Sequence, residues 1–255
     1  MVNYDVREAV ATLTIDDPER RNPMSVATME GLRDRMREAM ADESVRVVVV
    51  TGAGDKAFSA GGDLSSGFVD DPIGLHRSRG MLAELFRAMW RGGKPTVARV
   101  NGHALAGGFG LAVACDITIC VDDAKLGVPE INVGLWPMMI TAALGRAMTR
   151  KAALDLMMTG RLISPQEALA LGAVSRVVAR PELDHAVSEV VQSLVSKSPA
   201  ALQLGRDAFY AATGLDPDSA LDRLQGGLTA VSLTEDSREG VLAFVEKREP
   251  RWRGR

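Results

Sequence analysis

Two apolar segments, each followed by a glycine-rich loop, are the strongest constraint on the fold. The first covers residues 47–51 and precedes Ala60-Gly61-Gly62, and the second covers residues 95–100 and precedes Ala106-Gly107-Gly108. Short apolar runs bounded by glycine are typical of buried strands. Helical patterns follow at about residues 76–91 and from residue 106. This repeated order of strand, turn and helix predicts an α/β fold.

The two loops also suggest a chemistry. They lack bulky side chains, so their main-chain N–H groups are open to a ligand, and two converging N–H groups can stabilise an oxyanion. Gly107 and Gly108 open a predicted helix, whose first N–H groups have no intrahelical partner and lie at its positive end. The alternative is that these glycines only allow a helix to pack closely on a strand. Neither loop holds a nucleophile, a set of metal ligands or a phosphate-binding lysine. The pair therefore predicts an enzyme that polarises a carbonyl group without attacking it.

Glu130 is the best candidate for a proton-transferring group. Its neighbours Val128, Pro129, Ile131 and Val133 are apolar. Partial removal of the carboxylate from water raises its pKa toward the range that suits a general acid or base. The alternative interpretation is a surface or helix-capping glutamate.

Composition excludes several other classes of protein. The 255 residues carry a net charge of −3 without a basic block, which argues against nucleic-acid binding. We expect no membrane partner and a cytoplasmic location, because no apolar stretch is long enough to span a bilayer and the N-terminus lacks a secretory pattern. The two cysteines, Cys115 and Cys120, are expected to be buried reduced thiols, and no metal-ligand spacing is present.

The chain resembles the enoyl-CoA hydratase/isomerase (crotonase) family from about Val2 to its C-terminus. Five segments carry the resemblance in the order of the family: Asn22–Ser25, Phe58–Leu64, Asn101–Gly108, Val128–Ile131 and Phe244–Arg248. The resemblance implies a spiral of repeated ββα units over residues 1–195 and a helical trimerisation region over residues 196–255. It also implies an acyl-CoA substrate with no separate cofactor, and a homotrimer or a dimer of trimers.

The resemblance assigns roles to individual residues. It implies that the N–H groups of Ala60 and Gly107 form an oxyanion hole for a thioester carbonyl, and that Glu130 transfers protons. It implies that Phe244 and Lys247 touch CoA from a neighbouring subunit. The other residues that it places along the CoA channel or the thioester are Asn22, Met24, Phe58, Ala60, Gly61, Gly62, Asp63, Leu64, Gly107 and Gly108.

Two positions depart from the family pattern. Hydratases of the family carry a second catalytic glutamate where this chain has Gly110. Addition of water benefits from two acid/base groups, whereas a double-bond shift needs only one carboxylate, so we expect an isomerase-type reaction. A hydratase with a replacement acid and a noncatalytic acyl-CoA binder remain alternatives. The second departure is at residues 134–139, because many family members have small glycines after the proline that is Pro137 here. Met138, Met139 and Trp136 either narrow or reshape the acyl pocket or pack in the core.

Overall fold

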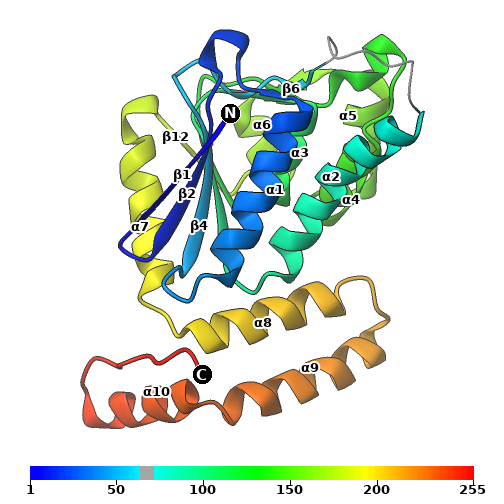
Figure 1. Ribbon diagram of the computed structural model, residues 1–255. Helices are drawn as coiled ribbons and strands as arrows, with labels where there is room; N and C mark the ends of the chain where they lie inside the picture. The colour runs from blue at the N-terminus through cyan, green and yellow to red at the C-terminus, as the bar shows by residue number, and fades with distance from the viewer. Residues whose placement is uncertain (64–71) are drawn as a thin grey trace.

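A six-stranded sheet forms the centre of the computed structural model, which describes residues 1–63 and 72–255 (Figure 1). Its strands lie in the order β1 (Val2–Arg7), β2 (Val10–Ile15), β4 (Val47–Gly52), β7 (Thr96–Val100), β9 (Ile117–Val121) and β12 (Arg176–Val178). Only the β1–β2 pair is antiparallel. Every residue of β4 is buried, as expected for a parallel strand that is covered on both faces.

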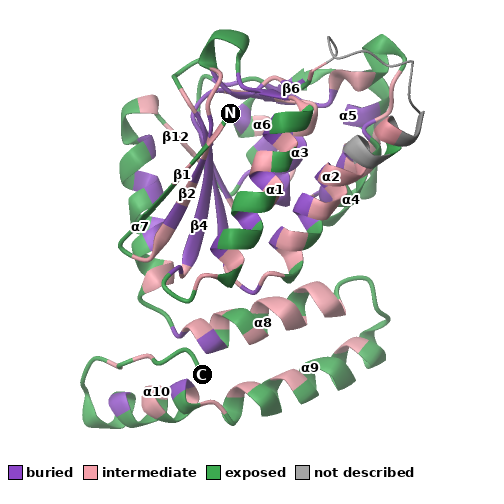
Figure 2. Cartoon of the chain, in the orientation of Figure 1, coloured by how far each residue is buried: buried purple, intermediate pink, exposed green. Residues whose placement is uncertain are grey.

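Helices cover both faces of this sheet (Figures 1 and 2). Helices α1 (Val26–Ala41) and α2 (Pro72–Arg91) lie on one side, and α7 (Leu183–Val195) lies on the other. Helix α1 starts after Ser25, a residue type that favours helix caps, and the Ser25 hydroxyl accepts a hydrogen bond from the Thr28 N–H. Helix α2 begins earlier than expected, at Pro72 rather than near His76.

Short strands form a second sheet above the first. Its order is β11 (Leu162–Ile163), β10 (Leu126–Gly127), β8 (His103–Leu105) and β5 (Ala57–Ser59). A further pair joins β3 (Pro23–Met24) to β6 (Gly61–Gly62). Each of β4, β7 and β9 is thus followed by a short strand of the second sheet and then by a helical segment. This repetition of ββα units confirms the expected crotonase-like α/β fold.

The second half of the chain is mostly helical. The core helices are α3 (Gly107–Ala114), α4 (Met138–Ala147), α5 (Arg150–Thr159) and α6 (Pro165–Ala170), and short 3₁₀ turns cover Pro18–Arg20, Pro129–Val133 and Arg180–Glu182. Helices α8 (Pro199–Ala212), α9 (Pro217–Ser232) and α10 (Glu235–Glu246) contact one another and form a separate layer at the bottom of Figure 1. None of the helices within the described residues combines the length and apolar character that a membrane span requires.

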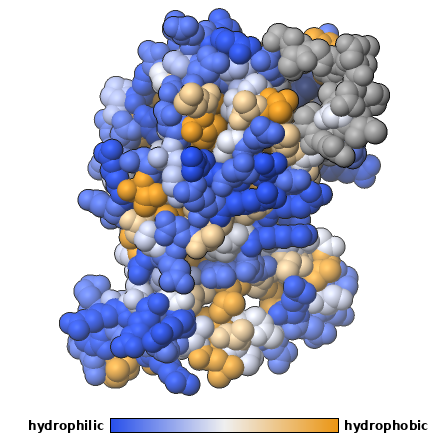
Figure 3. All heavy atoms as spheres, viewed as in Figure 1, coloured by the Kyte–Doolittle hydropathy of each residue, from blue (hydrophilic) through white to orange (hydrophobic). Residues whose placement is uncertain are grey.

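Large apolar side chains are exposed on this lower layer, where apolar surface is visible in Figure 3. They include Leu221, Leu224 and Leu228 on α9, and Phe244 and Val245 on α10. The spacing of the three leucines places them on one face of α9. Exposed apolar faces are typical of surfaces that contact another molecule.

Candidate active site at the ends of three parallel strands

Three neighbouring strands bring the predicted site residues to one edge of the second sheet. Strand β8 pairs in parallel with β5 on one side and with β10 on the other. Gly62, Gly107 and Glu130 follow the carboxyl ends of β5, β8 and β10, respectively. Because the carboxyl ends of parallel strands lie at the same edge, the two glycine loops and the glutamate converge there, which is where α/β sheets bind ligands.

The two glycine loops touch each other. Gly61 has a φ of +88°, and a Cβ atom added to it would stand 3.2 Å from the Gly107 nitrogen and 2.5 Å from the Ala106 Cβ. A Cβ atom added to Gly107 would stand 4.0 Å from the Gly62 nitrogen. Glycine is therefore needed at position 61 for both its backbone conformation and its lack of a side chain.

The structure corrects the expected donor in the first loop. The Ala60 N–H donates a hydrogen bond of 2.9 Å to the Arg21 carbonyl, so it is not available to a substrate. Gly62 is exposed, and its nitrogen lies near the start of α3, 4.0 Å from the position of a Cβ atom on Gly107. Gly62 is therefore the better partner for Gly107. The sequence motif contains both residues but does not indicate which N–H group the sheet already uses.

Gly107, in the second loop, is the first residue of α3. No side chain caps this helix within the described residues, and the first N–H groups of a helix have no intrahelical partner. Ala106 directly before it adopts φ 49° and ψ −128°, a strained conformation for a residue with a Cβ atom. Gly108 allows α3 to pack closely on β5, because a Cβ atom at this position would stand 2.6 Å from the Ser59 Cβ.

Glu130 lies in the 3₁₀ turn that follows β10, and it is half-buried. Its Oε2 atom is buried without a hydrogen-bond partner among the described residues. Burial raises the pKa of the Glu130 carboxyl, and a smaller contribution from its own main chain lowers it. A carboxylate that is held partly out of water without a cationic partner is suited to accept and return a proton.

Gly110 packs directly against α4. A Cβ atom at this position would stand 2.6 Å from Cγ1 and 2.9 Å from Cγ2 of Ile140. A glutamate at position 110 would therefore require the Ile140 side chain to shift. Position 110, where hydratases of the family carry their second glutamate, thus has no carboxylate and has no free space for one beside Ile140.

Two residues that were expected to line the CoA channel have side chains that a ligand cannot reach. Phe58 and Asn22 are both 0% exposed, and the Asn22 amide is used in hydrogen bonds within the protein. Ser59 is also fully buried, and its hydroxyl accepts a hydrogen bond from the Gly61 N–H. The reason is that β3, β5 and their connections pack inside the structure.

Other predicted residues do lie at the loops. The Met24 sulfur would stand 3.0 Å from a Cβ atom on Gly107, which places Met24 beside the second loop. Asp63 forms an ion pair of 2.7 Å with Arg20 next to Gly62. Leu64 lies outside the described residues.

Phe244 and Lys247, which the resemblance assigned to CoA, lie on a helix away from the glycine loops of their own chain. Phe244 is 85% exposed on α10, and Lys247 ends the same helix. Figure 1 shows α10 at the bottom of the molecule and β6 at the top. Within one chain, α10 and the glycine loop that contains β6 therefore lie at opposite ends of the molecule.

The bulky residues after Glu130 divide into two groups. Trp136 and Met139 are partly buried and pack against the hydrophobic core, whereas Met138 is exposed. Core packing thus accounts for two of the three.

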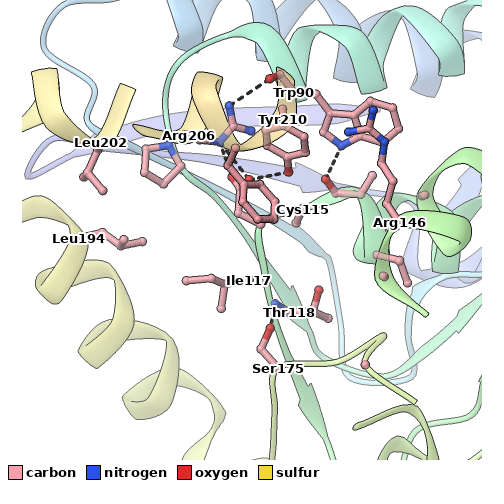
Figure 4. Close-up of a pocket in the computed structure, with 18 of the residues that line it drawn as sticks. Trp90, Cys115, Ile117, Thr118, Arg146, Ser175, Leu194, Leu202, Arg206 and Tyr210 are labelled. Atoms are coloured by element: carbon pink, nitrogen blue, oxygen red, sulfur yellow. Dashed lines mark hydrogen bonds and ion pairs between the residues drawn. The ribbon is translucent and has the colours of Figure 1, made fainter. Parts of the chain in front are cut away.

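A separate cavity of about 510 Å³ lies between α8 and the core (Figure 4). It does not include the glycine loops or Glu130. Its polar centre is the Asp116 carboxylate, which accepts hydrogen bonds from Thr96, Arg206 and Tyr210. These contacts anchor α8 to the core, as expected of a structural rather than a catalytic aspartate.

Comparison with known proteins identifies the family. The family model for enoyl-CoA hydratase/isomerase matches residues 5–255. The chain belongs to this family. It is 38% identical over 248 residues to a Thermus thermophilus protein named "Putative enoyl-CoA hydratase", with 95% of this chain and 97% of the relative covered.

Two further matches extend the comparison. Carnitinyl-CoA dehydratase of Escherichia coli K12 is 32% identical over 256 residues, covering 97% of this chain and 96% of the relative. The crystal structure of an enoyl-CoA hydratase from Mycobacterium smegmatis is 34% identical and superimposes with a TM-score of 0.93, with 98% of each chain covered. The protein is thus an enzyme that acts on CoA thioesters.

The buried Glu130 carboxyl predicts a pH-dependent effect on stability. The pKa of Glu130 is raised in the folded state, so its contribution to stability is present below the ordinary value of about 4.3 and is lost as the pH rises through the raised pKa. Glu130→Gln should therefore raise the melting temperature at pH 7, and this gain should shrink toward pH 4. Thermal unfolding followed by circular dichroism at both pH values measures it.

Glu30→Gln, at an exposed position of α1, is the matched control and should give no comparable gain. An equal gain for Glu130→Gln at both pH values would show that desolvation of this carboxylate is not the cause.

Proposed function

We propose that the enzyme shifts a double bond in an enoyl-CoA ester through a thioester enolate. The Gly62 and Gly107 N–H groups hold the thioester oxygen, and Glu130 moves the proton. One observation carries this proposal. The Glu130 carboxylate at the strand ends is partly removed from water, whereas Gly110 has no side chain and packs against Ile140.

The chemistry needs no second acid. In a 3-enoyl ester, the Glu130 carboxylate removes a proton from C2, and the electrons move into the carbonyl to form the enolate. The two N–H groups stabilise the negative oxygen, and each donor of this kind is worth about 3–4 kcal/mol in the transition state. The protonated Glu130 then returns the proton to C4, which yields the 2-enoyl ester and restores the carboxylate.

Addition of water is the second candidate function. The names of the relatives, enoyl-CoA hydratase and carnitinyl-CoA dehydratase, favour it. In this chain position 110 is a glycine, so a carboxylate from another position would have to activate the water. The two functions differ in the mass of the product, so one assay separates them.

The test is incubation of the protein with a panel of 2-enoyl- and 3-enoyl-CoA esters, read by mass spectrometry and ultraviolet absorbance. In ordinary water we expect 3-enoyl esters to be converted at constant mass. In deuterated water the product should carry deuterium at C4 and recovered ester should carry it at C2, the α carbon, because Glu130 can return a solvent-exchanged deuteron to either carbon. Glu130→Gln should lose conversion and exchange but retain binding, because glutamine keeps the size of the side chain and cannot accept the proton. Glu30→Gln should behave as wild type.

A product heavier than its 2-enoyl ester by one water, formed at an ordinary enzymatic turnover of about 10 per second or more, would contradict the isomerase proposal and show that the enzyme is a hydratase. No reaction across the panel, with binding retained, would favour a noncatalytic acyl-CoA binder.

We also propose that the protein assembles as a homotrimer or a dimer of trimers through the lower helical layer. The exposed apolar face of α9 and the exposed Phe244 on α10 support this assembly. Lys247 ends α10, which lies at the opposite end of Figure 1 from β6. Assembly would therefore bring it to CoA, where a lysine can act as a point charge beside phosphate.

Sedimentation equilibrium at micromolar concentration should give three or six times the chain mass of 27.2 kDa. Leu228→Glu, on the exposed face of α9, should shift the protein toward monomer, because a buried unpaired charge is costly at an interface. Glu30→Gln serves again as the control. A wild-type monomer at this concentration would refute the proposed assembly.

A further inference from the structure

Two buried asparagine amides converge on one carbonyl oxygen below the glycine loops. Asn22 is 0% exposed and donates from Nδ2 to the Ala57 carbonyl at 2.8 Å. Asn101 is 2% exposed and donates from Nδ2 to the same oxygen at 3.4 Å. Ala57 is the first residue of β5, and Asn101 lies just before β8. The shared contact therefore lies where the strands leading to both loops begin.

Each amide also holds the turn that precedes β5. Asn22 Nδ2 donates to the Ala53 carbonyl at 2.9 Å, and Asn101 Nδ2 donates to the Gly54 carbonyl at 2.8 Å. The amide oxygens accept main-chain N–H groups, from Asp17 for Asn22 and from Gly52 for Asn101. Both side chains are buried and use both of their N–H donors within the protein, so they act inside it.

Asn22 is the more closely coupled to the first loop. Arg21 and Asn22 have φ values of 62° and 55°, a left-handed conformation that asparagine tolerates. The Arg21 carbonyl accepts the Ala60 N–H, and β3, which starts at Pro23, pairs with β6, which contains Gly62. The segment around Asn22 thus contacts the loop at its beginning, its middle and its end.

We infer that Asn22 is a positioning residue that sets the separation between the Gly62 and Gly107 N–H groups. This inference rests on the proposed function, in which both groups bind the thioester oxygen. Loss of the Asn22 amide removes this donor from the Ala53 carbonyl and leaves the Ala57 carbonyl with only the longer bond of 3.4 Å from Asn101. The weaker hold lets β5 and β6 shift relative to α3. A displacement of about 1 Å at a catalytic group can cost about a hundredfold in rate.

The test reads the polarisation of the bound carbonyl directly. A 2-enoyl-CoA ester with a ¹³C thioester carbonyl is bound to the Glu130→Gln protein, which keeps the ester unreacted, and the carbonyl stretch is recorded by infrared difference spectroscopy. We expect binding to lower the stretching frequency. Addition of Asn22→Ala should remove most of this shift, and in the Glu130 enzyme it should lower kcat about tenfold or more with a smaller change in KM.

Asn22→Asp is the second variant, for use if Asn22→Ala does not fold. It keeps the size and the acceptor for the Asp17 N–H but replaces the donor to Ala57. Asn3→Ala, at an exposed asparagine bonded to Asp16, is the control and should retain the full shift.

A lower melting temperature with a full carbonyl shift and unchanged kcat in a folded Asn22 variant would overturn the inference. That result would leave Asn22 with a structural role alone. Absence of any carbonyl shift in the Glu130→Gln protein with Asn22 intact would instead refute the oxyanion hole of the proposed function, so the two failures are distinguishable.

Discussion

The parallel pairing of β5, β8 and β10 is the interaction on which the site depends. These strands are only two or three residues long, and strands of that length are not stable alone. They persist because each continues from a long, buried strand of the six-stranded sheet, such as β4 with its run of valines. Hydrophobic burial in the larger sheet thus positions the polar groups at the end of the smaller one.

The site itself contains features that oppose folding. Glu130 is half-buried, and one of its oxygens has no hydrogen-bond partner in the part of the chain that the structure describes. Ala106 is held at a positive φ. Left-handed or otherwise rare backbone conformations cost about 1–3 kcal/mol each and persist where the surrounding structure enforces them. Here the enforcing contacts are the close packing of Gly61 on Ala106 and of Gly108 on Ser59. Stability is given up at the residues that are proposed to do the chemistry, as is common in enzymes.

Much of the fold and part of the site could be predicted from sequence because their signals are local. The Ser25 cap, the valine run of β4 and the apolar neighbours of Glu130 are each visible within a few residues. The choice between Ala60 and Gly62 as a donor is not local. It depends on the hydrogen bond from Ala60 to Arg21, which lies 39 positions earlier in the chain (60 − 21 = 39). The burial of Phe58 and Asn22 likewise follows from packing between distant segments.

The most direct test of the central claim is a crystal structure of the protein with a bound 2-enoyl-CoA ester, using Glu130→Gln to prevent turnover. The account predicts that the thioester oxygen lies within about 3.2 Å of both the Gly62 and Gly107 nitrogens, with the side chain of residue 130 facing C2 and C4 of the acyl chain. A thioester oxygen more than about 4 Å from either nitrogen would contradict it, because no hydrogen bond is made at that distance.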